Sequence, residues 1–157
     1  MFFRKKKPAL MAYATGKLIS IEKVEDDVFS QKMMGDGVAI IPNKGEIYAP
    51  CDGEVVVVFE PTLHAVGIKM SNGMEVLLHV GLDTVNIEEK VFNCNVKVGD
   101  RVHAGDLLIQ YDQGQLKSLG YTDVTMCVIT NPGDAKDIVL MEEKDVTAKA
   151  DQIATYK

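Results

Sequence analysis

Short apolar segments separated by tight turns form the main pattern along this chain. The turns carry Gly-Asp, Asn-Gly and Asp-Gly pairs, which favour sharp reversals of the backbone. Short strands at near-regular spacing are typical of an antiparallel β-sandwich or barrel-sandwich, so we expect an all-β fold with little helix. The clearest predicted strands span residues 38–41, 54–59, 65–70, 74–80, 107–111 and 124–129.

A helix is expected in one place, because no stretch keeps helical periodicity beyond about two turns. It runs from Asp112 to Ser118, with Asp112 as N-cap and Gly120 as the stop signal. The similar segments 98–102 and 104–108 each contain Gly-Asp and predict two tight turns near one another.

Composition supports one folded domain. The chain has 157 residues, 46% of them hydrophobic and 25% charged, which argues against disorder. It contains 19 Val, 11 Ile and no Trp, and this β-branched enrichment favours strands. We expect residues 1–10 to form a mobile N-terminal arm and residues 11–157 to form a single domain, present as a monomer.

Charge and hydrophobic length exclude two classes of partner. A net charge of -6 makes nucleic acid an unfavourable ligand, since its binding depends on Lys and Arg that neutralise phosphates. The uninterrupted apolar runs, such as Val55 to Phe59, are too short for stable membrane insertion. The apolar segment after the basic N-terminus is also too short for an export signal, so we expect a cytoplasmic protein.

Two histidines flank one predicted hairpin and are the candidates for chemistry. Asn72-Gly73 favours a two-residue turn, which would place His79 opposite Val66 and His64 opposite Gly81. In that register both imidazoles emerge on one face as diagonal neighbours. One ring could then act as a nucleophile that carries a group while the other steadies it.

Other active-site chemistries find less support in the sequence. A catalytic zinc site needs a third protein ligand, and neither H-x-H nor H-E-x-x-H occurs. The three cysteines, Cys51, Cys94 and Cys127, lack CxxC spacing and are expected to be free thiols. No G-x-S-x-G motif of a serine hydrolase is present.

Five collinear segments point to a known family. They are VLLHVGLDTV at residues 76–85, VFSQKMMGDGVAI at 28–40, APCDGEV at 49–55, TLHAVG at 62–67, and VGDRV at 98–102 followed by Gly105-Asp106. These segments resemble the glucose-type IIA component of the bacterial phosphoenolpyruvate-dependent sugar phosphotransferase system. The resemblance covers nearly the whole chain after about residue 14 and follows the order of the family.

The resemblance implies a role for each matching residue at the histidine pair. His79 would be phosphorylated at Nε2 by the phosphocarrier HPr and would pass the group to a IIB domain, which works with a membrane IIC domain. His64 would donate a hydrogen bond to the phosphoryl oxygens, and Thr62 would orient His64. The transition state of phosphoryl transfer is stabilised mainly by positioning and charge, so an N–H donor beside the nucleophile suits the chemistry.

The resemblance also implies a docking surface for these partners, which we expect on other chains. Asp36 and Asp83 would meet a basic residue of HPr, and an apolar rim would be formed by Val38, Ile40, Leu77, Leu82 and Val85. No cofactor is required. Zinc between His64 and His79, completed by a partner carboxylate, and regulatory contacts with permeases or metabolic enzymes are further implications.

Two alternatives belong to other functional classes. A biotinyl or lipoyl carrier shares short strands and a Lys beside Met, here Lys32-Met33, although the residue order differs from that of such carriers. A purely regulatory binding module would use the same face without phosphate. The identity of the sugar is not encoded in this chain.

Overall fold

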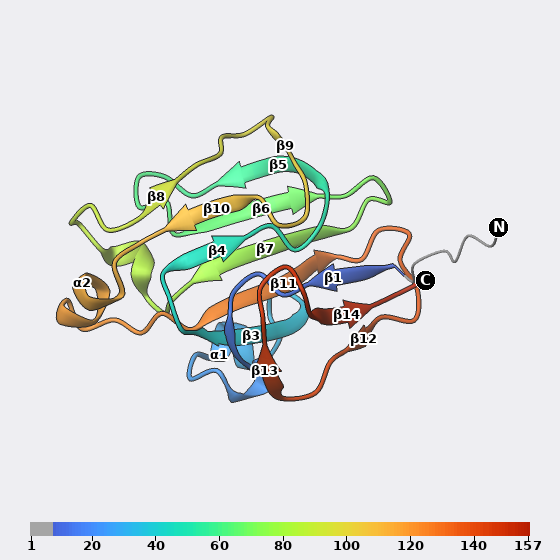
Figure 1. Cartoon of the computed structure of the whole chain (residues 1–157), viewed down its shortest axis with the longest axis horizontal. Coiled ribbons are helices and arrows are strands. Elements are labelled where there is room, and N and C mark those ends of the chain that lie inside the picture. The colour runs from blue at the N-terminus through green and yellow to red at the C-terminus, as the bar shows by residue number, and fades with distance from the viewer. Residues whose placement is uncertain (1–7) are drawn as a thin grey trace.

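The computed structural model describes residues 8–157 and is built almost entirely of antiparallel strands (Figure 1). The helical elements are short: η1 (Ile21–Lys23), α1 (Asp27–Ser30), η2 (Thr84–Asn86) and α2 (Gln113–Ser118). The strands are β1 (Ala9–Met11), β2 (Gly16–Ser20), β3 (Asp36–Pro42), β4 (Glu46–Tyr48), β5 (Gly53–Val58), β6 (Ala65–Lys69), β7 (Glu75–Val80), β8 (Asn93–Cys94), β9 (Arg101–Val102), β10 (Leu107–Gln110), β11 (Thr125–Asn131), β12 (Val139–Leu140), β13 (Lys144–Val146) and β14 (Gln152–Thr155).

One large sheet and two small sheets make up the fold. The large sheet has the strand order β13-β2-β3-β11-β7-β6-β5-β9, and the small sheets have the orders β1-β14-β12 and β4-β10-β8. Figure 1 shows β4, β10 and β1 in front of the large sheet, with the ends of the large sheet to the top and bottom. The expected all-β antiparallel sandwich is confirmed.

The centre of the large sheet has a strict alternation of two faces. His79 of β7 pairs with Met126 of β11, which in turn pairs with Ala39 of β3, so these three side chains share one face. Their neighbours Leu78 and Cys127 point to the opposite face. We call the face with His79 the outer face and the face with Leu78 the inner face.

Each face of the sheet has its own hydrophobic cluster. The inner face packs against the two small sheets and holds most of the core, including Leu78 and Ile109 at 0% exposure. The outer face carries a smaller cluster, in which Ile21 and Phe29 from the η1–α1 segment cover the middle of the sheet. The sequence pattern did not predict this helical segment, because α1 has only four residues.

Local predictions held where turn chemistry dominates. Asp112 caps α2 by accepting a hydrogen bond from the Gln115 N–H at 3.0 Å, as the pattern predicted. The two Gly-Asp turns are also equivalent: Gly99 N–H donates to the Val55 carbonyl at 2.8 Å, and Gly105 N–H donates to the Ala49 carbonyl at 2.9 Å. Both turns therefore anchor to the same segment, 49–55.

The boundary of the predicted N-terminal arm was wrong at its C-terminal end. Ala9 and Leu10 belong to β1 and pair with β14, and Leu10 is buried in the main core. The pairing residues are far apart in sequence, so no local pattern marks this strand. Residues 1–7 of the predicted arm lie outside the described residues.

Candidate functional site

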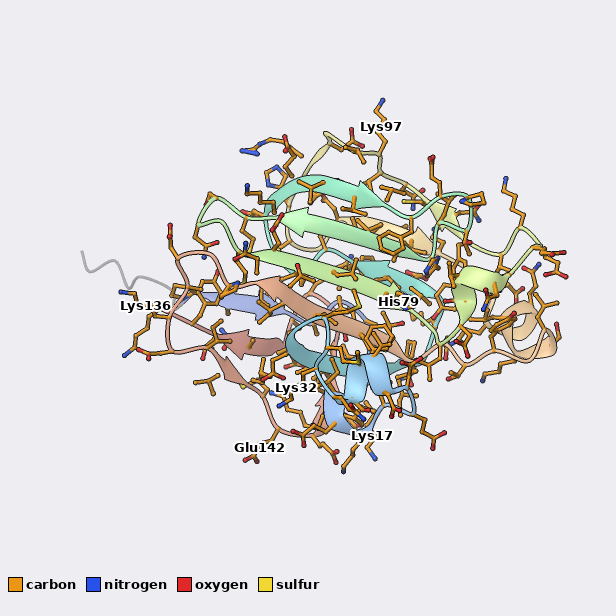
Figure 2. The ribbon with its side chains drawn as sticks, turned by 180° about the vertical axis from the view of Figure 1, so that it is seen from behind. Lys17, Lys32, His79, Lys97, Lys136 and Glu142 are labelled. Atoms are coloured by element: carbon orange, nitrogen blue, oxygen red, sulfur yellow. The ribbon has the colours of Figure 1, made fainter. Side chains whose placement is uncertain are left out.

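His79 lies near the end of β7 on the outer face of the large sheet, beside α1 (Figure 2). Its direct neighbours across the sheet are Ala65 of β6 and Met126 of β11, both fully buried. The Phe29 ring of α1 packs against the imidazole, with ring centroids 5.0 Å apart. These apolar contacts leave His79 partly exposed and prevent its ring from turning freely.

One ring nitrogen of His79 already has a hydrogen-bond partner in the protein. Nδ1 lies 3.0 Å from the Gly81 carbonyl oxygen, which can only accept, so Nδ1 carries the proton. Nε2 of the neutral ring therefore has a free lone pair. Burial lowers the pKa of His79, although the Gly81 carbonyl and the nearby Asp26 carboxylate act in the opposite direction. The site presents a neutral nucleophilic nitrogen near pH 7.

His64 lies beside His79, but the two strands do not pair in the register that the sequence predicted. The hairpin is shifted by one residue: His79 lies opposite Ala65, not Val66, because the turn spans three residues and Gly73 adopts a φ of +85°. That shift alone would put the histidines on opposite faces. His64 precedes β6, which begins at Ala65, and the chain departs from extended geometry at Leu63, with φ +67°.

The imidazole of His64 is enclosed by other rings. Its centroid lies 4.7 Å from that of His79, with the two planes at 83°, and Phe59 and Phe92 lie at 5.6 Å and 6.4 Å. The side chain is 1% exposed. Burial and the neighbouring His79 lower the pKa of His64 to about 4, so its ring is neutral at pH 7.

The nitrogens of His64 have no partners. Among the buried side-chain polar atoms of residues 8–157, Nδ1 and Nε2 of His64 are the ones without a hydrogen bond. Buried polar groups are nearly always paired, because an unpaired group costs about 1–3 kcal/mol. Such a pair of free nitrogens next to a nucleophile is suited to bind a group that arrives from outside.

The expected role of Thr62 in orienting His64 is not supported. The Thr62 hydroxyl donates to the Val85 carbonyl at 3.3 Å and makes no bond to either ring nitrogen of His64. Through this bond Thr62 faces the η2 loop, which contains Val85. Ring packing, not a hydroxyl, holds His64 in place.

The acidic residues of the site differ in part from the predicted ones. Asp83 lies on the turn after β7, four residues beyond His79 in sequence. Asp36 lies at the far end of β3, three residues along from Ala39, which corresponds to about 10 Å. Asp26, whose charge acts on His79, was not among the predicted residues. In the sequence Asp26 could be recognised only as the N-cap of a short helix. Its side chain accepts a hydrogen bond from the Val28 N–H at 2.9 Å.

The predicted apolar rim divides between the two faces of the sheet. Val38 and Ile40 were assigned wrongly: both point to the inner face and are buried in the main core, because β3 presents Ala39 to the histidines. Leu77 and Leu82 do pack in the outer cluster. Val85 is 59% exposed on the η2 loop, beside Thr62.

An apolar groove continues from the histidines along the outer face. It has a volume of about 220 Å³, and its lining includes Met34, Val57, Phe59, Gly67 and Leu77. The groove exists because Gly67 has no side chain between Val57 and Leu77, its partners on the two neighbouring strands. Phe59 links the groove to the site through its contact with His64.

The site does not by itself contain a complete metal centre. Within residues 8–157, no group of three or more His, Cys, Asp or Glu side chains is arranged to hold a metal ion. Two imidazoles would supply two of the four ligands that zinc requires. The cysteines lie elsewhere, and none forms a disulfide.

Known proteins are similar to this chain in sequence and in fold. The family model of the phosphoenolpyruvate-dependent sugar phosphotransferase system, EIIA 1, matches residues 8–135. A glucose-specific EIIA component from Oceanobacillus iheyensis is 40% identical over 94% of this chain and 89% of the relative. A second, from Halalkalibacterium halodurans, is 48% identical over 78% of this chain and 70% of the relative.

Larger relatives and a solved structure extend the match. A glucose-specific EIICBA component from Staphylococcus saprophyticus is 42% identical over 89% of this chain, which corresponds to 20% of that relative. The structure of glucose permease IIA from Mycoplasma capricolum superposes with a TM-score of 0.82 and 34% identity, covering 98% of both chains. The chain therefore belongs to the EIIA 1 family and serves as a phosphoryl carrier of the sugar phosphotransferase system.

Proposed function

We propose that His79 is the phosphorylated residue of this carrier. The donor is the phosphohistidine of HPr: the bond between its nitrogen and phosphorus breaks as the bond from His79 Nε2 to phosphorus forms. The supporting observation is the 3.0 Å bond from Nδ1 to the Gly81 carbonyl, which leaves the Nε2 lone pair free. The transfer runs between two imidazoles and requires no metal ion.

His64 acts as the donor to the phosphoryl oxygens in this proposal. Its neutral ring has one N–H, lies 4.7 Å from the His79 ring between centroids, and has no partner in the unphosphorylated protein. A donor in a water-poor site stabilises developing charge more strongly than a solvated one does. A bound phosphoryl group would also raise the pKa of His64, because an anion favours the imidazolium form.

HPr and IIB would dock in turn on the outer face around His79. The exposed Val57 and Phe59 and the groove beside them offer an apolar contact, and Asp26 and Asp83 offer negative charge next to the nucleophile. Weak, transient interfaces of this kind gain their association rate from charge complementarity. The names of the relatives favour glucose as the sugar that finally receives the phosphate.

Zinc binding at the histidine pair is a further, separate proposal. The free nitrogens of His64 and Nε2 of His79 could supply two ligands, and a carboxylate of a docked partner with a water molecule would complete a tetrahedron. Zinc and phosphate would then compete for Nε2 of His79.

The carrier alternative based on Lys32 loses support from the structure. The Lys32 ammonium group lies 3.1 Å from Glu22 and 3.6 Å from Asp36, and these contacts raise its pKa. Lys32 also follows α1 directly and does not lie at the tip of a β-hairpin. A charged, paired amine is a poor acceptor for biotin or lipoate. Regulatory binding and a cytoplasmic location stay predictions; no helix among the described residues has the length and apolar character to cross a membrane.

Phosphorylation in vitro tests the proposed function. The purified protein is incubated with phosphoenolpyruvate, enzyme I and HPr, and its mass is then measured at alkaline pH, where phosphohistidine is stable. We expect one phosphoryl group on the native protein and on His103→Ala, whose histidine is exposed, and none on His79→Ala. Phosphate on His79→Ala would refute the assignment.

A further inference from the structure

In the turn that follows β7, the peptide unit between Val80 and Gly81 forms a hydrogen bond through its carbonyl and another through its N–H. The Val80 carbonyl oxygen accepts a hydrogen bond from the Thr84 hydroxyl at 2.6 Å, and the Gly81 N–H donates to the Val124 carbonyl at 2.8 Å. These two polar groups belong to the same peptide unit, Val80–Gly81. The unit can therefore rotate only if two hydrogen bonds break together.

Thr84 occupies a position that the regular sheet leaves open. The ladder between β6 and β7 ends where the Val80 N–H donates to the His64 carbonyl at 2.9 Å. The chain then turns away at Leu63, and the Val80 carbonyl takes its hydrogen bond from Thr84. Thr84 is 0% exposed, so water does not replace this donor.

The next carbonyl along the chain, that of Gly81, determines which ring nitrogen of His79 carries the proton. Gly81 has a φ of +80°, and glycine in this region has several accessible orientations for its carbonyl. The γ-methyl of Thr84 fills the space into which a Cβ on Gly81 would project, and the Thr122 carbonyl lies 2.6 Å from that point. The Thr84 hydroxyl and methyl thus restrict Gly81 from two directions.

We propose that Thr84 is a positioning residue for phosphoryl transfer: its hydroxyl holds the Val80–Gly81 peptide so that the Gly81 carbonyl stays aimed at Nδ1 of His79. Thr84 touches neither the phosphoryl group nor His79. It acts through the 3.0 Å contact between Nδ1 and the Gly81 oxygen, which fixes the proton on Nδ1. Without that contact the proton is free to occupy Nε2, and a protonated Nε2 has no lone pair for phosphorus.

This inference rests on the proposed function only in its kinetic consequence. The tautomer of His79 is a property of the unphosphorylated protein and can be measured without HPr. The ¹⁵N chemical shifts of the two ring nitrogens, recorded well above the pKa, report which one carries the proton. The tautomer result thus stands even if another residue proves to be the phosphoryl acceptor.

The informative variant is Thr84→Val, which keeps a branched side chain of similar size and removes the hydroxyl. We expect its His79 ring to shift toward the Nε2–H tautomer and its rate of phosphorylation by phospho-HPr to fall about five- to tenfold, the effect of losing one net hydrogen bond. Thr84→Ser, which keeps the hydroxyl, should retain the native tautomer and most of the rate. If Thr84→Val does not fold, Thr84→Ala serves, because it adds no atom to the turn.

Thr125→Val is the matched structural control. Thr125 is also 0% exposed, lies opposite Val80, and donates through its hydroxyl to the Asp123 carbonyl at 2.8 Å. Its loss should reduce thermal stability by a similar amount and leave the His79 tautomer unchanged. A native tautomer in folded Thr84→Val, or an equal shift in Thr84→Ser and Thr125→Val, would overturn the proposal. A shifted tautomer in Thr84→Val with unchanged phosphorylation would overturn the kinetic part alone.

Discussion

His64 and His79 lie in a T-shaped arrangement with their ring centroids 4.7 Å apart, although Ala65 is the residue directly opposite His79 in the sheet. Leu63, the residue before His64, has a left-handed φ of +67°, and β6 begins only at Ala65. The pair therefore forms at an irregular strand end. Such irregular positions are common where a site must place two side chains that a regular sheet would separate.

Replacement of His64 by Gln should separate acceptance of the phosphoryl group from its delivery. Nε2 of His79 keeps its lone pair in His64→Gln, so we expect phosphorylation by HPr to continue. Transfer to IIB should fall by at least tenfold, since the donor beside the phosphoryl oxygens is misplaced. Rapid-quench measurement of both half-reactions tests this, and unimpaired delivery would remove the role assigned to His64.

Protein stability should fall as the pH decreases below the ordinary pKa of histidine. Burial lowers the pKa of His64 from 6.5 to about 4, so the unfolded chain binds a proton in this range and the folded chain does not. This term is close to zero above about pH 7.5 and costs about 2 kcal/mol of unfolding free energy at pH 5. Urea denaturation of the native protein and of His64→Gln, each at about pH 7.5 and at about pH 5, measures this contribution of His64 to the free energy of unfolding. An equal pH dependence in the two would contradict the prediction.

Replacement of Gly81 by Ala should disrupt both the fold and the site. A Cβ at this position would meet the Thr84 methyl and the Thr122 carbonyl, and the φ of +80° adds backbone strain. Gly99→Ala is a matched control, with a φ of +97° and nothing within 4 Å of its Cβ. We expect Gly99→Ala to cost about 1–2 kcal/mol and Gly81→Ala clearly more, measured by thermal unfolding. Similar costs would show that space around Gly81 is not limiting.

Asp26 should be detectable through the titration of His79. Its carboxylate raises the pKa of His79, whereas burial lowers it. Asp26→Asn removes the charge and keeps a good N-cap for α1, so the fold should be retained and the pKa of His79 should decrease. Proton NMR titration of His79 provides the measurement. Asp27→Asn, one residue further along α1, serves as control, and an equal shift there would argue against a specific effect of Asp26.

A lysine introduced into the apolar groove should weaken docking of HPr. Val57 is 39% exposed, lines the groove and lies on the outer face, so a buried ammonium group there would oppose both apolar contact and a basic partner. Val57→Lys should raise the KM for phospho-HPr several-fold. Val139→Lys, on β12 in another sheet, should have no effect although Val139 is 53% exposed. Equal effects would place the interface elsewhere.

Features that depend only on neighbouring residues could be predicted from the sequence. The six strands expected from the apolar runs, the helix capped by Asp112 and the paired Gly-Asp turns are all present, because turn chemistry and strand periodicity act over a few residues. The motif around His79 also identified the family. Charge and composition added the expectation of a single acidic domain.

Which side chains meet at the site depends on contacts that a local pattern does not contain. The face of β3 that carries Ala39, the charge of Asp26 beside His79, and the pairing of β1 with β14 all depend on contacts between distant segments. The hairpin register was off by one residue because Gly73 in a left-handed conformation lengthened the turn. The two histidines still meet at the end of the strand pair, where Leu63 is also left-handed, and a local pattern contains no information on how two such irregularities combine.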